Sequence, residues 1–198
     1  MPPVIRFLII ANVAIFVAGA AYMPGVTAAF GLWPAGSFAV AGFPGRVGFE
    51  PWQLLTYGFL HANLAHVGLN MFGLYTFGRE VELTTGSRRF AALYFASVLT
   101  AGFTQLLVVS LPTVTDPYPT IGASGGVFGV LLAFAMLYPR RMIRLIIPPI
   151  PMRAWVFVSL YAVAELIQGV TGTAAGVAHF AHLGGMVGAW LVLRHRRT

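Results

Sequence analysis

Apolar residues along the chain are gathered into long runs, and short polar or Gly/Pro-rich stretches separate these runs. A transmembrane helix needs about 20 mostly apolar residues, and six runs come near or exceed that length. They lie at residues 4–21, 54–78, 89–110, 123–139, 153–170 and 177–193. We therefore expect an all-α membrane protein with six transmembrane helices, and one membrane domain that takes in residues 1–198.

Composition strengthens this interpretation. Charged residues make up 9% of the 198 residues and hydrophobic residues 58%, whereas soluble domains contain about 25% charged residues. Such a chain cannot cover a water-exposed surface, so lipid must be its solvent. The chain has no cysteine, which excludes disulfides and thiolate metal sites.

The basic residues indicate how the chain is oriented. All twelve are arginines, set against five acidic residues, which gives a net charge of +7. The arginines fall between the apolar runs, which indicates membrane topology, and we expect no nucleic-acid partner. If the six helices alternate, every arginine except Arg46 lies on one side, so both termini are expected to be cytoplasmic.

Polar residues inside apolar runs are costly in lipid and are therefore functional candidates. Ser124 stands among glycines at the start of the fourth run, and His66 and Asn70 lie four residues apart on one face of the second. The sixth run begins with His179 and His182. In an alternating topology these three runs all begin on the external side. We therefore expect their polar groups to lie at similar depth and to form one site.

A serine hydroxyl is a weak nucleophile until a base takes its proton, and an imidazole titrates near neutral pH. His182 can be that base for Ser124. The sequence offers no acid suited to orient His182, because Asp116 lies in a Pro-rich loop and Glu165 in the middle of the fifth run. We therefore expect a serine–histidine dyad.

The oxyanion that forms during acyl transfer needs hydrogen-bond donors. His66, Asn70 and the backbone N–H of Ser124 can supply them, aided by the positive end of the fourth helix. Gly122 and Gly125 let the substrate backbone and neighbouring helices come close.

Less specific explanations stay open at this point. Small residues in membrane helices usually serve packing, and polar ones often bond to neighbouring helices. Intramembrane histidines can also relay protons in a transporter, or bind a metal as a cluster of His61, His66, His179 and His182. The chain has no His-Glu-x-x-His pair. We expect neither a metal nor a cofactor.

In combination, three motifs resemble the rhomboid family of intramembrane serine proteases, in its minimal six-helix bacterial form. They are Gly122–Gly125 (Gly-x-Ser-Gly), His66–Asn70 (His-x-x-x-Asn) and Ala181–Gly185 (Ala-His followed by small residues). The resemblance covers nearly the whole chain and implies a rhomboid-like bundle. It implies that Ser124 is the nucleophile and that His182 rather than His179 is the base.

Other positions resemble the family less specifically. Phe128 follows Ser124 by one turn, where an aromatic ring commonly packs on the catalytic histidine, and Glu82 and Gly86 resemble a structural acid and glycine. One departure is that Gln53 follows Trp52, where some relatives have arginine.

The resemblance also implies a function. The expected substrates are transmembrane segments of other proteins, which enter sideways from the bilayer, often past a mobile fifth helix, here residues 153–170. The Pro-rich stretch 146–151 before it is expected to act as a hinge, since it cannot be helical throughout. The expected location is the bacterial inner membrane. The alternative is a catalytically silent rhomboid-like protein that binds membrane-protein clients.

Overall fold

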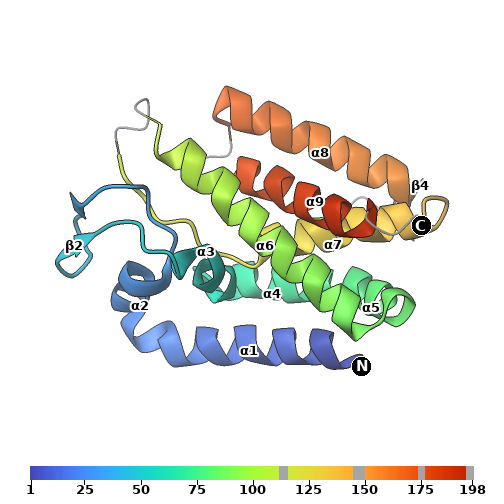
Figure 1. Cartoon of the computed structure of the whole chain (residues 1–198), viewed down its shortest axis with the longest axis horizontal. Helices are drawn as coiled ribbons and strands as arrows, with labels where there is room; N and C mark the ends of the chain where they lie inside the picture. The colour runs from blue at the N-terminus through green and yellow to red at the C-terminus, as the bar shows by residue number, and fades with distance from the viewer. Residues whose placement is uncertain (112–115, 145–149, 174–176, 195–198) are drawn as a thin grey trace.

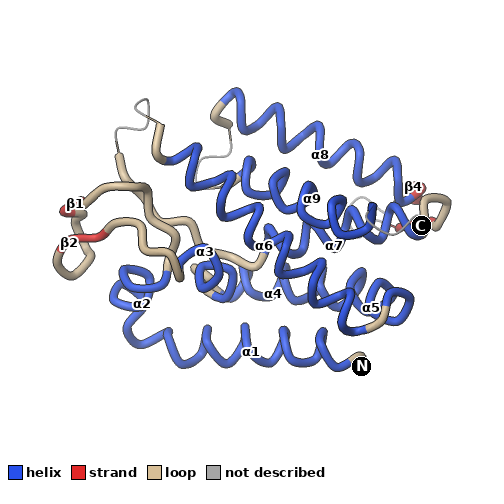
Figure 2. Tube along the Cα trace, viewed as in Figure 1, coloured by secondary structure: helices blue, strands red, loops and turns tan. Residues whose placement is uncertain are grey.

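The computed structural model describes residues 1–111, 116–144, 150–173 and 177–194 (Figures 1 and 2). The α-helices are α1 (Pro3–Gly19), α2 (Met23–Phe30), α3 (Gln53–Thr56), α4 (Leu64–Gly73), α5 (Arg79–Thr85), α6 (Ser87–Val109), α7 (Ser124–Leu137), α8 (Ala154–Thr171) and α9 (His179–Arg194). Single tighter or wider turns connect some of them: η1 (Ala20–Tyr22), η2 (Tyr57–Phe59) and the π-helical η3 (Leu74–Gly78). Two short antiparallel hairpins pair β1 (Phe38–Ala39) with β2 (Arg46–Val47) and β3 (Met142–Arg144) with β4 (Pro151–Arg153).

The second long helix begins and ends further along the chain than the expected range 54–78, so this prediction is wrong in its bounds. Its first part forms the separate α3 and η2, the chain then breaks at 60–63, and a continuous helical stretch runs from Leu64 to Thr85. The break ends at Asn63, whose side chain accepts a hydrogen bond from the His66 N–H at 2.9 Å and so caps α4. His61 and Asn63 therefore precede the helix that carries His66.

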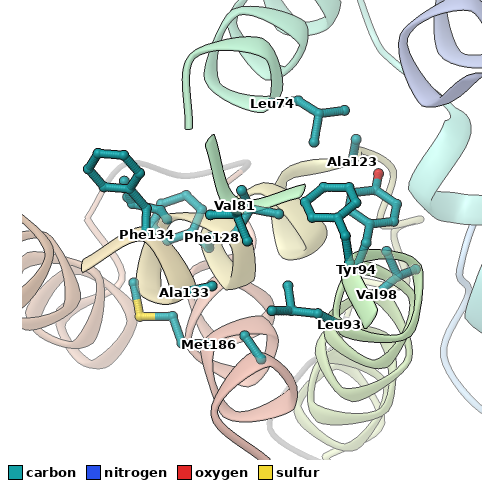
Figure 3. Packing of buried hydrophobic residues seen from close by; sticks show 14 of the residues in the cluster. Leu74, Val81, Leu93, Tyr94, Val98, Ala123, Phe128, Ala133, Phe134 and Met186 are labelled. Atoms are coloured by element: carbon teal, nitrogen blue, oxygen red, sulfur yellow. The ribbon is translucent and has the colours of Figure 1, made fainter. Parts of the chain in front are cut away.

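Three helices form the centre of the molecule. α6, α7 and α9 pack closely on one another, and Figure 3 shows their apolar side chains meeting with those of η3 and α5. Glycines allow the close approach of α7 and α9, because a Cβ on Gly185 would overlap the carbonyl of Gly125 and one on Gly129 would lie 2.8 Å from the carbonyl oxygen of Gly185. Such backbone-to-backbone packing is typical of membrane helices.

The outer helices lie on opposite sides of this centre. α1 lies beneath α4 and α5 in the view of Figure 1, and α8 lies above α9. Buried Glu82 on α5 accepts the N–H groups of Val4 and Ile5 at 3.0 and 2.8 Å and the Ser87 hydroxyl at 2.7 Å, which ties α5 to the start of α1. Gly86 follows with a φ of 79°, a left-handed conformation that favours glycine.

Among the described residues, three stretches are long and apolar enough to cross a membrane: Pro3–Phe30, Ser87–Val109 and Ala154–Thr171. Helices also occupy the other expected runs. α7 and α9 are shorter, with 14 and 16 residues, and the stretch 64–85 is not among the three candidate spans. The count of six spans and the cytoplasmic placement of the termini stay predictions. Residues 146–149 of the proposed hinge, and the arginines at 196 and 197, lie outside the described part of the chain.

Candidate active site

Ser124 is the first residue of α7, and the chain that leads into it is held on two sides. Thr120 pairs with Leu32 through two backbone hydrogen bonds of 2.8 and 3.0 Å, and the Gly122 N–H donates to the Tyr57 carbonyl at 2.9 Å. Ala123 at the N-cap makes no side-chain hydrogen bond to the helix. The first N–H groups of a helix have no partner inside it, so α7 presents donors beside the Ser124 hydroxyl.

His182 lies on α9, one turn into the helix, and meets Ser124 directly. Its Nε2 is 2.8 Å from the Ser124 Oγ. The ring of Phe128, one turn after Ser124 on α7, stacks on the imidazole at a centroid distance of 4.1 Å and an interplanar angle of 5°. The stacking position predicted for Phe128 is confirmed, and the buried imidazole has its ring plane fixed by it.

The expectation that no acid reaches His182 is wrong. Glu165 on α8 places its Oε2 2.9 Å from the His182 Nδ1, on the opposite side of the ring from Ser124. The same oxygen lies 2.7 Å from the Nδ1 of His179. Both α8 and α9 turn these side chains toward each other, and their rotation about their own axes could not be read from the run of apolar residues.

His66 and Asn70 lie together on α4, and the His66 side chain faces Gly122, two residues before Ser124. A Cβ built on Gly122 would lie 2.8 Å from the His66 Nε2 and 3.6 Å from the Ser124 Oγ, so these two groups face the same small space. The buried Asn70 donates one N–H to the His66 carbonyl at 2.9 Å, which leaves its second N–H free to bond elsewhere. Gly122 itself has a φ of 135°.

Gly125 and His61 lie at the edge of this arrangement. A Cβ on Gly125 would overlap the Ala101 Cβ of α6, so this glycine brings helices together. His61 is fully buried, and its ring packs edge-on against that of His66 with centroids 4.9 Å apart.

The candidate metal ligands that the structure brings together differ from the four histidines named in the sequence. Within the described ranges, ligand atoms of Glu165, His179 and His182 lie within 4.8 Å of one another. Two imidazoles and a carboxylate are ligands that zinc accepts. His61 and His66 do not belong to this cluster, so the four-histidine set is not brought together.

Among the described residues, three stretches could cross a membrane, and a serine hydroxyl contacts a stacked imidazole. Together these features define a membrane protein with a candidate serine-hydrolase site. Comparison with known proteins is consistent with this class. The sequence model of the Rhomboid domain matches residues 48–196, which is most of the chain. This chain belongs to the rhomboid family.

Curated relatives carry rhomboid names. Rhomboid protein 1, mitochondrial, of Saccharomyces cerevisiae is 35% identical over 134 residues, which cover 64% of this chain and 36% of that protein. The rhomboid protease GluP of Bacillus subtilis is 38% identical over 95 residues, 47% of this chain and 17% of that protein. Rhomboid-like protein 11, chloroplastic, of Arabidopsis thaliana is 32% identical over 152 residues, 73% of this chain and 52% of that protein. The chain thus spans about half or less of the length of these relatives.

The family resemblance expected from the motifs is confirmed, and the apolar helices make this an integral membrane protein. Rhomboid proteins are typically intramembrane serine proteases that act on transmembrane substrates, although inactive members exist. The bacterial form and the bacterial inner membrane stay predictions, since relatives include mitochondrial and chloroplast proteins.

Proposed function

We propose that this protein is an intramembrane serine endopeptidase in which Ser124 is the nucleophile and His182 the base. The observation that carries the proposal is the 2.8 Å contact between the His182 Nε2 and the Ser124 Oγ. An unprotonated Nε2 accepts the hydroxyl proton as Oγ attacks the scissile carbonyl carbon. The same imidazole then gives this proton to the leaving amine, and water hydrolyses the acyl-enzyme in a second round of the same steps.

The negative oxygen of the tetrahedral intermediate is stabilised by donors from two helices. The N–H of Ser124 at the start of α7 contributes one, together with the positive end of the helix. His66 and the second N–H of Asn70 contribute from α4. The space beside Gly122, between His66 and Ser124, supports this assignment because it is where a carbonyl oxygen would have to enter.

The length of α7 supports cleavage inside the membrane. Its 14 residues rise about 21 Å, which is less than the ~30 Å of the hydrocarbon core. Arg140 and Arg141 follow its C-terminal end and belong at a membrane surface. Ser124, at the other end, then lies below the opposite surface, where a transmembrane segment of a membrane protein is the accessible substrate.

The test is cleavage of a model transmembrane substrate by the purified protein in liposomes, with labelling by a fluorophosphonate as a second measurement. Wild type is expected to cleave the substrate and to be labelled at Ser124. Ser124→Ala and His182→Ala are expected to lose cleavage while remaining folded, and His179→Ala to keep substantial activity. Cleavage that persists in Ser124→Ala would exclude the serine mechanism.

The alternative of a catalytically silent protein that binds membrane-protein clients gives a different result. In that case the wild type captures the substrate without cutting it and is not labelled. We favour the protease because the serine and the imidazole are both present and in contact.

A further inference from the structure

Glu165 is a buried carboxylate on a helix that is otherwise mostly exposed. Of the 18 residues of α8, the buried ones are Ala154, Val158 and Glu165, which lie on one face. A carboxylate in this environment is costly unless it is paired and hydrogen-bonded. Glu165 finds its partners on α9, where one oxygen meets two imidazoles.

His179 meets the same carboxylate from a second position on α9. Its Nδ1 faces the carboxylate oxygen of Glu165 at 2.7 Å, and its Nε2 faces the carbonyl oxygen of Thr173 at 3.2 Å. One oxygen of Glu165 therefore has two side-chain hydrogen-bond partners on α9, which fix its position.

The two partners of His182 select one tautomer of its ring. Its Nδ1 faces the same carboxylate oxygen at 2.9 Å, and its Nε2 faces the hydroxyl of Ser124 at 2.8 Å. A neutral imidazole with its proton on Nδ1 donates to Glu165 and leaves the Nε2 lone pair for the serine proton. This is the tautomer that the base needs, and an acceptor at Nδ1 selects it.

We propose that Glu165 is a positioning residue that holds His182 in its reactive tautomer, with His179 as a second hydrogen-bond partner that helps to hold the carboxylate in place. The inference rests on the proposed protease function and deepens it, since it places a third polar group behind the serine–histidine pair. When His182 takes the serine proton, Glu165 stabilises the imidazolium that forms. No atom of Glu165 touches the substrate.

Because Glu165 lies on α8, the orientation of the base depends on where α8 sits. A Cβ on Gly169 would lie 3.1 Å from the ring of Phe180 and 3.2 Å from the Cβ of His179, so α8 approaches α9 closely one turn beyond Glu165. Displacement of α8 at this end would carry the carboxylate away from both imidazoles.

The experiment compares Glu165→Gln and Glu165→Met with the wild type in liposomes, measuring kcat and KM for a transmembrane substrate and the rate of fluorophosphonate labelling. Gln keeps an acceptor oxygen and removes the charge, whereas Met removes both at similar volume. We expect kcat and the labelling rate to fall by on the order of 10²-fold in Glu165→Gln and further in Glu165→Met. KM should stay near the wild-type value.

Glu82→Gln is the matched control, because Glu82 is equally buried but bonds to backbone and hydroxyl donors of α1 and α6. It is expected to lower thermal stability and to leave kcat unchanged. A loss of kcat in Glu82→Gln as large as in Glu165→Gln would show that the effect is a general result of removing a buried charge, and would overturn the proposal.

Two further results would also overturn it. Wild-type kcat in folded Glu165→Gln and Glu165→Met, while Ser124→Ala is inactive, would leave the protease function intact and remove Glu165 from it. Loss of wild-type cleavage on chelation, with recovery on adding Zn²⁺, would make Glu165, His179 and His182 a metal site. A wild type that neither cleaves nor is labelled would instead contradict the protease function itself.

Discussion

The contact between α7 and α9 and the contact between α8 and α9 hold the candidate site in different ways. α7 and α9 meet backbone against backbone at Gly125 and Gly185, with no side chain between them. α8 is attached through few buried residues, and the polar one is Glu165. The nucleophile and the base are therefore fixed to each other by close backbone packing, whereas the carboxylate behind the base sits on a helix with few buried residues.

This difference separates two requirements of an intramembrane protease. The distance between Ser124 and His182 must hold at each turnover, and glycine packing leaves no room for it to change. In the proposed protease, a transmembrane substrate is expected to enter from the side, which would require one helix to give way. α8 meets the second requirement better than α9, because most of its apolar surface faces outward.

The largest effect is expected where the rigid contact is broken. In Gly185→Ala the new methyl group would overlap the Gly125 carbonyl and push α7 from α9. Overpacking typically lowers the free energy of unfolding by about 1–3 kcal/mol or more, and cleavage should become undetectable. Thermal unfolding and fluorophosphonate labelling measure the two effects.

Gly68→Ala is the matched control for this change, because a Cβ there has nothing within 4 Å. It is expected to be neutral or to stabilise α4 by roughly 0.5–1 kcal/mol. Normal stability and cleavage in Gly185→Ala would mean that the α7–α9 contact is not rigid.

The next effect is expected at Gly122, where an added side chain would meet the polar groups of the candidate site and not the backbone of another helix. An alanine methyl group would stand 2.8 Å from the His66 Nε2, in the space that it shares with Ser124. We expect kcat to fall by about 10²–10³-fold, the usual loss when an oxyanion interaction is removed. Gly42 also has a positive φ, of 83°, with no atom within 4 Å of a Cβ, so an equal loss in Gly42→Ala would show that backbone strain is responsible.

A similar or smaller effect is expected for the oxyanion donors on α4. His66→Ala and Asn70→Ala should each lower kcat by about 10²–10³-fold with little change in KM. The double variant should lose less than the product of the two, because both donors serve one oxygen. Asn63→Ala, which removes the cap of α4, should cost stability of about 1 kcal/mol without changing kcat. Wild-type kcat in both single variants would leave only backbone donors.

Much of the rigid region could be predicted from the sequence, because it depends on short motifs and on alternation. The three runs that carry His66, Ser124 and His182 all start at one end of the bundle in any alternating topology, and the structure brings these residues together. The stacking of Phe128 on His182 was implied by the family resemblance, in which an aromatic ring commonly follows the serine by one turn. The break before α4 was missed, although Asn63 is a typical N-cap residue three positions before His66.

The partnership of Glu165 could not be predicted from the same reasoning. It depends on how α8 and α9 are rotated about their own axes, and neither helix has a strongly one-sided apolar pattern. One signal was present in the sequence. An acid in the middle of an apolar run must find a partner, and His179 and His182 were the titratable residues of the following run.

The smallest effect is expected on α8 itself. Phe157 is half-buried against the core, and its ring lies 5.7 Å from that of Tyr161, so Phe157→Ala should loosen α8 without touching Ser124 or His182. If substrates enter past α8, cleavage of a transmembrane substrate should rise a few-fold, while labelling by a small fluorophosphonate, which needs no helix to move, stays unchanged. Phe103→Ala makes the same substitution at an exposed position of α6 and should change neither rate. A parallel fall of cleavage and labelling in Phe157→Ala would mean that α8 supports the site as rigidly as α7 and α9 do.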